Sequence, residues 1–188
     1  MFKQDVLPFF RAWLDNPLGV AAITPSSSVL ADLITSEIKP ESAPVLELGP
    51  GTGVFTRALR SRGVPENELM LVEADEKFAQ LLQFRFPDAT ILHMNAAHLR
   101  RLPFSEDGGI GAVVSGLPLL SMPPRTILLI LAGAFAHLRA DGHFYQFTYG
   151  FSCPVPRRIL ERLGLQATRI GGVLANVPPA SVYRISRR

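Results

Sequence analysis

Glycine alternates with other residues in VLELGPGTGVF, residues 45–55, just after an apolar run that contains a carboxylate. Gly49, Gly51 and Gly53 follow Glu47 in a pattern typical of a strand that turns into a helix. Such a loop presents backbone N–H groups and the positive end of the helix to a ligand. A phosphate loop would need Lys and then Ser or Thr after its last glycine, and a dinucleotide loop would need glycine where Val54 stands. The spacing therefore predicts a ligand loop that fits neither template.

Two carboxylates indicate what this loop binds. Glu47 would repel a pyrophosphate and attract an ammonium group. Glu73 ends the next expected strand, about twenty residues after the loop, where a carboxylate accepts hydrogen bonds from ribose hydroxyls. An amino-acid ammonium group and a ribose occur together in S-adenosylmethionine.

ELGPGTG, residues 47–53, matches the first motif of the class I methyltransferases, and the chain resembles that family in element order from residue 44 to 188. The resemblance assigns the methionine portion of the cofactor to Glu47 and the loop backbone, and the ribose to Glu73. The family has an acidic residue after the third strand for the adenine amino group, and Asn95 stands there with a carbonyl oxygen that can accept the same hydrogen bond. The resemblance also implies cofactor contacts at Pro50, Thr52, Ala74, Ala96, Ser115 and Gly116. A tight turn without a ligand is the alternative for the loop, and the two carboxylates in register argue against it.

The elements that must position these residues alternate along the chain. Apolar runs at 43–49, 69–75, 89–95, 110–116 and 142–150 alternate with helical patterns, including 55–63, 77–86 and 124–139. This predicts a doubly wound, Rossmann-like α/β fold with a mostly parallel sheet, and a helix that begins near Thr52. Two further strands, 167–177 and 180–188, are joined too briefly to be parallel. We therefore expect seven strands that close with an antiparallel hairpin.

Composition narrows the class of protein. The chain has 188 residues, 47% of them hydrophobic, and a net charge of +3, which predicts a single domain over 1–188. Within it we expect an amino-terminal helical cover over 1–40 and a catalytic core over 41–188. Cys153 is the single cysteine and no His or Cys spacing suits a metal, so we expect a cytoplasmic protein without a metal site. The apolar run ILLILAGAFA is too short to span a bilayer.

The acceptor of the methyl group is expected beside the fourth strand, at VVSGLPLLS, residues 113–121. Methylases of exocyclic base nitrogens have Asn or Asp, Pro and an aromatic residue there, so that a carboxamide meets the amino group and a ring stacks on the flipped base. This chain has Gly116, Leu117, Pro118 and Leu119, which lack both groups. The motif argues against a nucleic-acid substrate, although the layout resembles the rRNA adenine dimethyltransferases.

Motifs along nearly the whole chain resemble the bacterial phospholipid N-methyltransferases: FFRAWLDNPLGVAAITPSS, ELGPGTGVFTRAL, VVSGLPLLS, QFTYG and NVPPASVYRI. The resemblance implies methylation of the phosphatidylethanolamine headgroup towards phosphatidylcholine, at the inner face of the cell membrane. An adenine N6-methyltransferase-like enzyme and a cofactor-binding module without turnover are the alternatives.

An apolar stripe near the amino terminus suits an interfacial helix. Phe2, Val6, Phe9, Phe10 and Trp13 share one helical face, and Lys3 and Arg11 lie off it. An ordinary cover for the cofactor pocket is the alternative role. We expect Trp13 and Thr24 to contact substrate or membrane, together with Leu117, Pro118 and Leu119.

The acceptor amine must lose a proton before it can attack, and the sequence assigns no base to this step. Tyr149, at the end of the fifth expected strand, is the first candidate to orient the amine, and Gln146 is the second. Phe147 and Tyr149 favour methylated ammonium groups by cation–π contact if the strand is regular.

Overall fold

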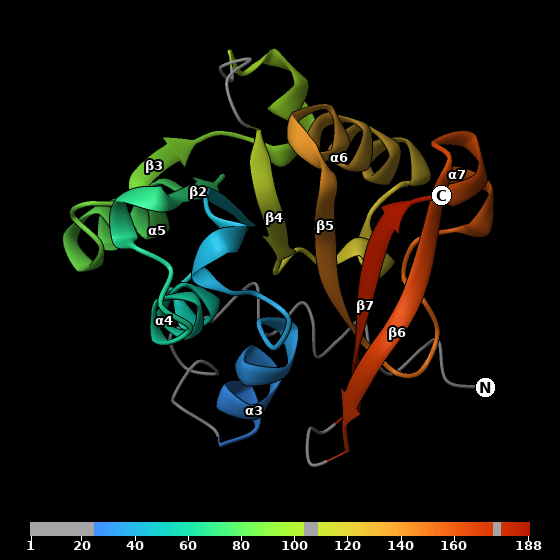
Figure 1. Cartoon of the computed structure of the whole chain (residues 1–188), viewed down its shortest axis with the longest axis horizontal. Helices are drawn as coiled ribbons and strands as arrows, with labels where there is room; N and C mark the ends of the chain where they lie inside the picture. Colours follow the sequence, from blue (N-terminus) through green and yellow to red (C-terminus); the bar gives the residue numbers. More distant parts are fainter. Residues whose placement is uncertain (1–24, 104–108, 175–177) are drawn as a thin grey trace.

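The computed structural model describes residues 25–103, 109–174 and 178–188, so the predicted interfacial helix, with Trp13 and Thr24, lies outside the described residues. A seven-stranded sheet crosses the molecule in the order β3-β2-β1-β4-β5-β7-β6 (Figure 1). Its strands are β1 Val45–Leu48, β2 Leu69–Glu73, β3 Thr90–His93, β4 Ile110–Ser115, β5 Leu138–Tyr149, β6 Leu165–Val173 and β7 Ala180–Arg187. The α-helices are α3 Pro25–Ile34, α4 Val54–Ser61, α5 Glu76–Arg85, α6 Pro124–His137 and α7 Arg157–Arg162. The 3₁₀ helices are η1 Pro40–Ser42, η2 Glu66–Glu68, η3 Ala96–Arg101 and η4 Leu119–Ser121.

The pairing of the strands confirms the predicted fold. β1 to β5 run parallel to one another, and β7 runs antiparallel between β5 and β6. From β1 the strand order runs outward through β2 and β3 on one side, and the chain then crosses back to β4 on the other side of β1. Ligands of open α/β sheets bind at the carboxyl ends of the strands beside such a reversal.

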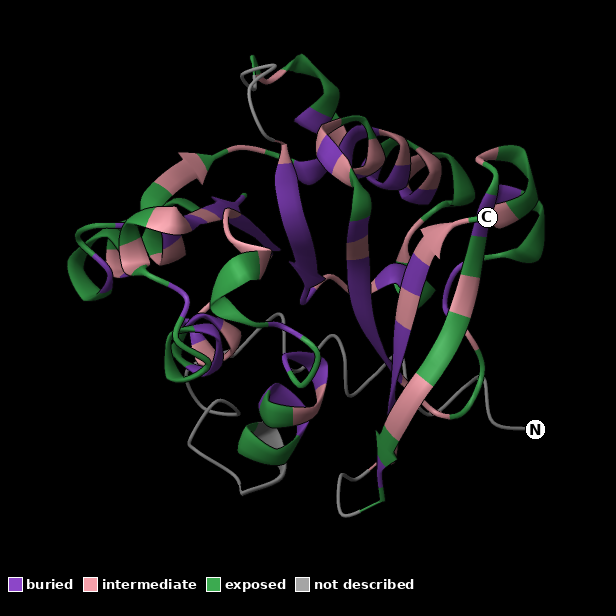
Figure 2. Ribbon diagram, in the orientation of Figure 1, coloured by how far each residue is buried: buried purple, intermediate pink, exposed green. Residues whose placement is uncertain are grey.

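Helices cover both faces of the sheet. On one face, Ala112 and Val114 of β4 share a core with Leu59 of α4, and on the other face Val113 shares a core with Ile130 of α6. All six residues of β4 are buried (Figure 2). Burial on both faces explains why this strand has an unbroken apolar sequence.

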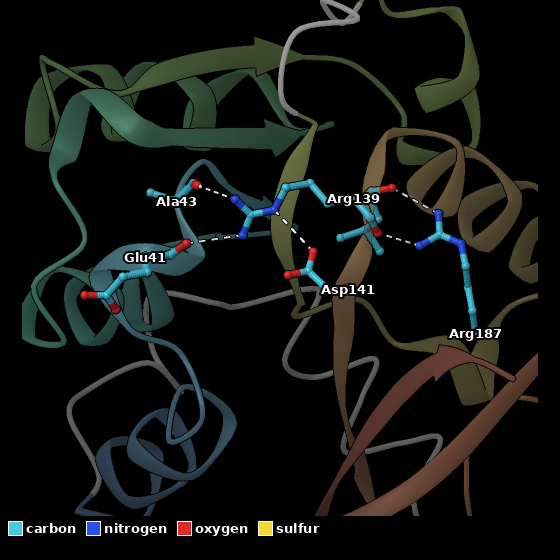
Figure 3. A network of polar contacts seen from close by, with 6 residues as sticks. Glu41, Ala43, Arg139, Asp141 and Arg187 are labelled. Atoms are coloured by element: carbon cyan, nitrogen blue, oxygen red, sulfur yellow. Dashed lines mark hydrogen bonds and ion pairs between the residues drawn. The ribbon is translucent and has the colours of Figure 1, made fainter.

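An arginine from the last strand sets the end of α6. The sequence predicts a helix over 124–139, but α6 ends at His137 and Leu138 begins β5. The Arg187 guanidinium donates to the main-chain oxygens of Phe135, Leu138 and Arg139, at 2.6, 3.0 and 2.6 Å. Figure 3 shows Arg187 beside Arg139. Arg187 supplies the positive charge and the donors that the carboxyl end of a helix lacks.

A second arginine ties the start of β5 to the segment before β1. Arg139 donates to the carbonyl oxygens of Glu41 at 3.2 Å and Ala43 at 3.4 Å, and its Nε lies 3.6 Å from Asp141 (Figure 3). Both arginines lie at the amino edge of the sheet and so stabilise the scaffold away from the carboxyl edge.

Candidate active site at the carboxyl edge of the sheet

The glycine loop lies at the carboxyl end of β1, and its three glycines all have left-handed backbone conformations. Gly49, Gly51 and Gly53 have φ angles of 67°, 55° and 80°. A Cβ on Gly49 would lie 2.8 Å from Leu117, and one on Gly53 would lie 2.5 Å from the Phe86 ring. A Cβ on Gly51 would meet no atom within 4 Å. Gly51 is therefore where the loop backbone faces open space, whereas the other two glycines allow close packing.

The loop also determines where α4 begins. The expected start near Thr52 is wrong by two positions, because α4 begins at Val54. Gly53 is its N-cap in the left-handed conformation, and its N–H donates to the Pro50 carbonyl at 2.8 Å. The chain therefore closes a turn over 50–53 before it becomes helical, and the loop is longer than the sequence pattern indicates.

Glu47 is a buried acid with one oxygen that has no partner. The residue has no exposed surface, and Thr56 of α4 donates to its Oε2 at 2.7 Å. Its Oε1 is buried without a hydrogen bond. Burial raises the pKa of this carboxyl to about 8, the Thr56 hydroxyl opposes the rise, and nearby Glu73 adds to it. An ammonium group would satisfy the free oxygen and stabilise the carboxylate, so the residue fits the amino-acid end of S-adenosylmethionine.

Glu73 joins the loops that follow β1 and β2. Its Oε2 accepts from the Gly51 N–H at 3.0 Å, and its Oε1 accepts from the N–H groups of Ala74 and Asp75 at 2.8 and 3.0 Å. The structure therefore brings Glu47, Gly51 and Glu73 together, as the sequence predicts. The contact of Glu73 with a ribose stays a prediction.

Asn95 and Ala96 follow β3, which pairs with β2. The Asn95 side chain is exposed, and its Oδ1 accepts from the Ala97 N–H at 2.9 Å as the N-cap of η3. A hydrogen bond from an adenine amino group would use the second lone pair of this oxygen. Ala96 is buried in the core shared with α6, so its side chain packs in the protein interior.

The loop after β4 packs against the glycine loop. The Ser115 hydroxyl accepts from the Leu117 N–H at 3.3 Å, and the Gly116 N–H donates to the Leu48 carbonyl at 2.8 Å. A Cβ on Gly116 would lie 2.7 Å from the carbonyl oxygen of Gly49. Position 116 therefore has no room for the carboxamide that base methylases carry there.

A pocket opens beside this loop, at the ends of β4 and β5. It is lined by Leu117, Pro118, Leu119, Leu120, Phe147, Thr148, Tyr149 and Pro154. This lining brings the predicted substrate residues 117–119 and Tyr149 together. The lining is mainly apolar and aromatic, with Thr148 as a polar member, and the described part of the chain contributes no carboxylate to it.

Phe147, which lines the pocket, contacts two other aromatic rings edge to face, those of Tyr149 and Phe55. The ring centroids of Phe147 and Tyr149 are 5.6 Å apart, and those of Phe55 and Phe147 are 5.9 Å apart. β5 pairs regularly with β7 from residue 144 to 149, so Phe147 and Tyr149 share a face. The sequence analysis did not single out Phe55. Its position in the first turn of α4, directly after the glycine loop, would have indicated that it lies near the site.

Tyr149 and Gln146 do not form one pair, because strand alternation places them on opposite faces of β5. Burial raises the pKa of the Tyr149 phenol, so the group is neutral at physiological pH and can orient an amine. Gln146 is buried, and its Nε2 donates to the carbonyl oxygens of Leu117 at 2.9 Å and Phe147 at 2.7 Å. It reaches the acceptor loop from the neighbouring strand.

The described residues form neither a metal site nor a membrane-spanning helix. Among them no group of three or more His, Cys, Asp or Glu side chains is placed to hold a metal ion. No helix within 25–103, 109–174 or 178–188 is long and apolar enough to cross a bilayer. Burial raises the pKa of the Cys153 thiol, which opposes formation of a reactive thiolate.

Known proteins share both the sequence and the fold. A methyltransferase-domain family model matches residues 45–142, just over half of the chain. The ornithine lipid N-methyltransferase of Singulisphaera acidiphila is 30% identical over 186 residues, which cover 96% of this chain and 95% of that protein. The ribosomal RNA small subunit methyltransferase A of a Synechococcus strain is 37% identical over 95 residues, 50% of this chain and 31% of that protein.

Solved structures agree in fold. The glycopeptide N-methyltransferase MtfA has a TM-score of 0.67 at 15% identity, over 86% of this chain and 90% of that chain. A TehB-like methyltransferase from Corynebacterium glutamicum has a TM-score of 0.64 at 15% identity, over 96% of this chain and 97% of that chain.

The chain belongs to the class I S-adenosylmethionine-dependent methyltransferases. Its cofactor is S-adenosylmethionine, and the loop at Gly51 with the free oxygen of Glu47 suits the amino-acid end of that molecule. Within the class, a relative that is 30% identical over 96% of this chain is named as an ornithine lipid N-methyltransferase.

Proposed function

We propose that the protein methylates the amine of phosphatidylethanolamine and of its partly methylated products, at a membrane surface. The observation that carries this proposal is the apolar, aromatic pocket beside Gly116, where base methylases carry a carboxamide and a stacking ring. The full-length similarity to a protein named as an ornithine lipid N-methyltransferase supports a lipid amine as substrate.

The pocket suits an amine that attacks in its neutral form. The bound cofactor supplies a methyl group on a positively charged sulfur. The nitrogen lone pair forms the new N–C bond as the C–S bond breaks, and the electron pair of that bond stays on sulfur. The ammonium form has no lone pair, so its proton leaves to water before the attack. The protein aligns the amine through the Tyr149 phenol and through the walls that Leu117 and Phe147 provide.

Exposed apolar side chains around the pocket support membrane contact. Leu120, Phe151 and Leu174 are 54%, 63% and 75% exposed. They follow β4, β5 and β6, which are parallel, so all three lie at the carboxyl edge where the pocket opens. Large apolar side chains that surround a site are typical of an interaction surface, and here a bilayer would hold the lipid headgroup at the pocket. The interfacial helix expected before residue 25 is part of the same proposal, as is the inner face of the cell membrane.

A base substrate is the rival supported by a specific similarity, to a ribosomal RNA methyltransferase over half of this chain. That similarity covers 50% of this chain and 31% of the other protein, and both proteins are methyltransferases. Leu119, which is buried in the core, stands where the stacking ring is expected. The acceptor motif therefore favours the lipid.

Labelled cofactor tests the proposal directly. The protein is incubated with vesicles that contain phosphatidylethanolamine, with vesicles that contain ornithine lipid, and with ribosomal RNA. Label in phosphatidylethanolamine is expected. Label in ornithine lipid alone would reassign the lipid, and label in RNA alone would reverse the assignment. Tight cofactor binding with no labelled acceptor would favour a cofactor-binding module without turnover.

A further inference from the structure

Position 116 lacks a polar side chain for a steric reason. Gly116 packs on the glycine loop so closely that a Cβ would lie 2.7 Å from the Gly49 oxygen and 3.5 Å from the Leu48 oxygen. The loop therefore cannot carry an acceptor for the amine N–H at this position. If the amine is oriented by a carboxamide, that group must come from another strand.

Gln146 brings a carboxamide to this place. It pairs in register with Ser115, the last residue of β4, and it has no exposed surface. Its Nε2 donates both hydrogens, one to the Leu117 carbonyl and one to the Phe147 carbonyl. These two bonds determine the orientation of the amide, because the flipped amide would set its oxygen against two carbonyl oxygens.

The amide oxygen is left without a partner. The Oε1 of Gln146 is buried and accepts no hydrogen bond, although it belongs to a residue whose donors are both used. A buried acceptor without a donor costs free energy comparable to a lost hydrogen bond, so such groups are rare outside functional sites. Leu117, which the same amide holds, lines the acceptor pocket.

The geometry points to Gln146 as the residue that orients the acceptor amine, with its Oε1 accepting an N–H of the nitrogen that receives the methyl group. This inference rests on the proposed amine substrate. The hydrogen bond directs the nitrogen lone pair away from Gln146, and the Leu117 carbonyl stays fixed by Nε2. Gln146 would thus take the part that a carboxamide at position 116 takes in base methylases.

If Gln146 orients the amine, its loss should affect the three methyl transfers unequally, whereas a purely structural role would affect them equally. A neutral primary amine has two N–H groups and a neutral secondary amine has one, whereas a neutral tertiary amine has none. The hydrogen bond to Oε1 therefore helps the first and second methyl transfers and cannot help the third. Loss of the oxygen should slow the first two transfers selectively.

The experiment compares phosphatidylethanolamine and its monomethyl and dimethyl derivatives, each in mixed micelles, as substrates of the full chain. In Gln146→Leu, kcat/KM is expected to fall roughly tenfold with the primary and secondary amines and less than about threefold with the tertiary amine. The quantity compared is the ratio of secondary-amine to tertiary-amine rates within one variant. Partial unfolding cancels in this ratio.

Gln166→Leu is the matched control, because Gln166 near the start of β6 donates to Ser186 and Arg187 at the opposite edge of the sheet. Its ratio should equal that of the wild type. Equal losses on all three amines in Gln146→Leu would overturn the role of Gln146. A wild-type protein that methylates none of the three lipids would overturn the proposed function, and this inference with it.

Discussion

Cofactor binding should become tighter as pH rises, because Glu47 must lose a proton to pair with the cofactor. Burial raises the pKa of this carboxyl to about 8 in the ligand-free protein. A bound ammonium group stabilises the carboxylate, so binding releases a proton wherever the free protein holds one. With a pKa of about 8, the apparent dissociation constant should fall about 20-fold between about pH 6 and about pH 7.5. The predicted pH range ends at about 7.5 because the α-amino group of the ligand itself titrates near about pH 8.

Isothermal titration calorimetry with S-adenosylhomocysteine, in two buffers of different ionisation enthalpy, measures both the dissociation constant and the number of protons released on binding. Proton release should approach one per site near pH 6 in the wild type and vanish in Glu47→Gln. Thr56→Val removes the hydroxyl that lowers this pKa, so its binding profile should shift to higher pH. A wild-type dissociation constant that does not change over this range, with no proton release, would refute a protonated Glu47.

The same pKa predicts how the ligand-free protein responds to pH. The pKa of about 8 in the folded protein is above the ordinary pKa of 4.5, so the folded state holds this proton more tightly than the unfolded state. Stability from this group is therefore full below about pH 4.5 and is lost as pH rises to about 8. Glu47→Gln should flatten this part of the thermal unfolding profile.

Three further predictions concern the loop, the apolar rim and the scaffold. Gly51→Ala should cost only about 1 kcal/mol of stability but weaken cofactor binding at least about tenfold, because its Cβ would enter the open space where the cofactor is expected. Gly53→Ala should mainly lower stability, because its Cβ would collide with the Phe86 ring. Calorimetry measures the cofactor affinity of each variant and urea unfolding measures its stability. Equal changes of both quantities in the two variants would contradict the assigned geometry. Replacing Leu120 and Phe151 together by Glu should weaken sedimentation with phosphatidylethanolamine vesicles and spare cofactor binding, and unchanged sedimentation would move the membrane contact elsewhere. Arg187→Met should lower the free energy of unfolding by about 2 kcal/mol because the end of α6 loses its donors, with partial recovery in Arg187→Lys, and an unchanged urea midpoint would refute this.

Local patterns predicted the fold and the cofactor loop well. The glycine spacing and the apolar periodicity depend on neighbouring residues, so they indicated β1, the loop at Gly51 and the order of elements without knowledge of tertiary contacts. Glu47 and Glu73 were predictable for the same reason, since each lies at or near the end of its strand. The helix start was wrong because a left-handed Gly53 does not show in composition.

Contacts between distant residues could not be predicted. Gln146 meets the Leu117 carbonyl across 29 positions, and Arg187 reaches the end of α6 across 52. The Phe55–Phe147 contact also joins separate elements. The sequence allowed two interpretations of Asn95, because Asn is a preferred N-cap residue and its amide oxygen can also accept a hydrogen bond from a ligand. In the structure Asn95 is the N-cap of η3.

The two halves of the site are coupled by the contact between Gly49 and Gly116. The loop after β1 is the predicted cofactor loop, and the loop after β4 forms a wall of the proposed acceptor pocket, so their close approach would place donor and acceptor side by side. The glycine at 116 that departs from the base-methylase motif is what permits this approach, because any side chain there would collide with the Gly49 oxygen. The departure leaves this loop apolar, so under the proposed function polar contact with the amine would come from β5. One packing requirement between two loops would then account both for the proposed preference against bases and for the proposed role of Gln146, which pairs with the last residue of β4.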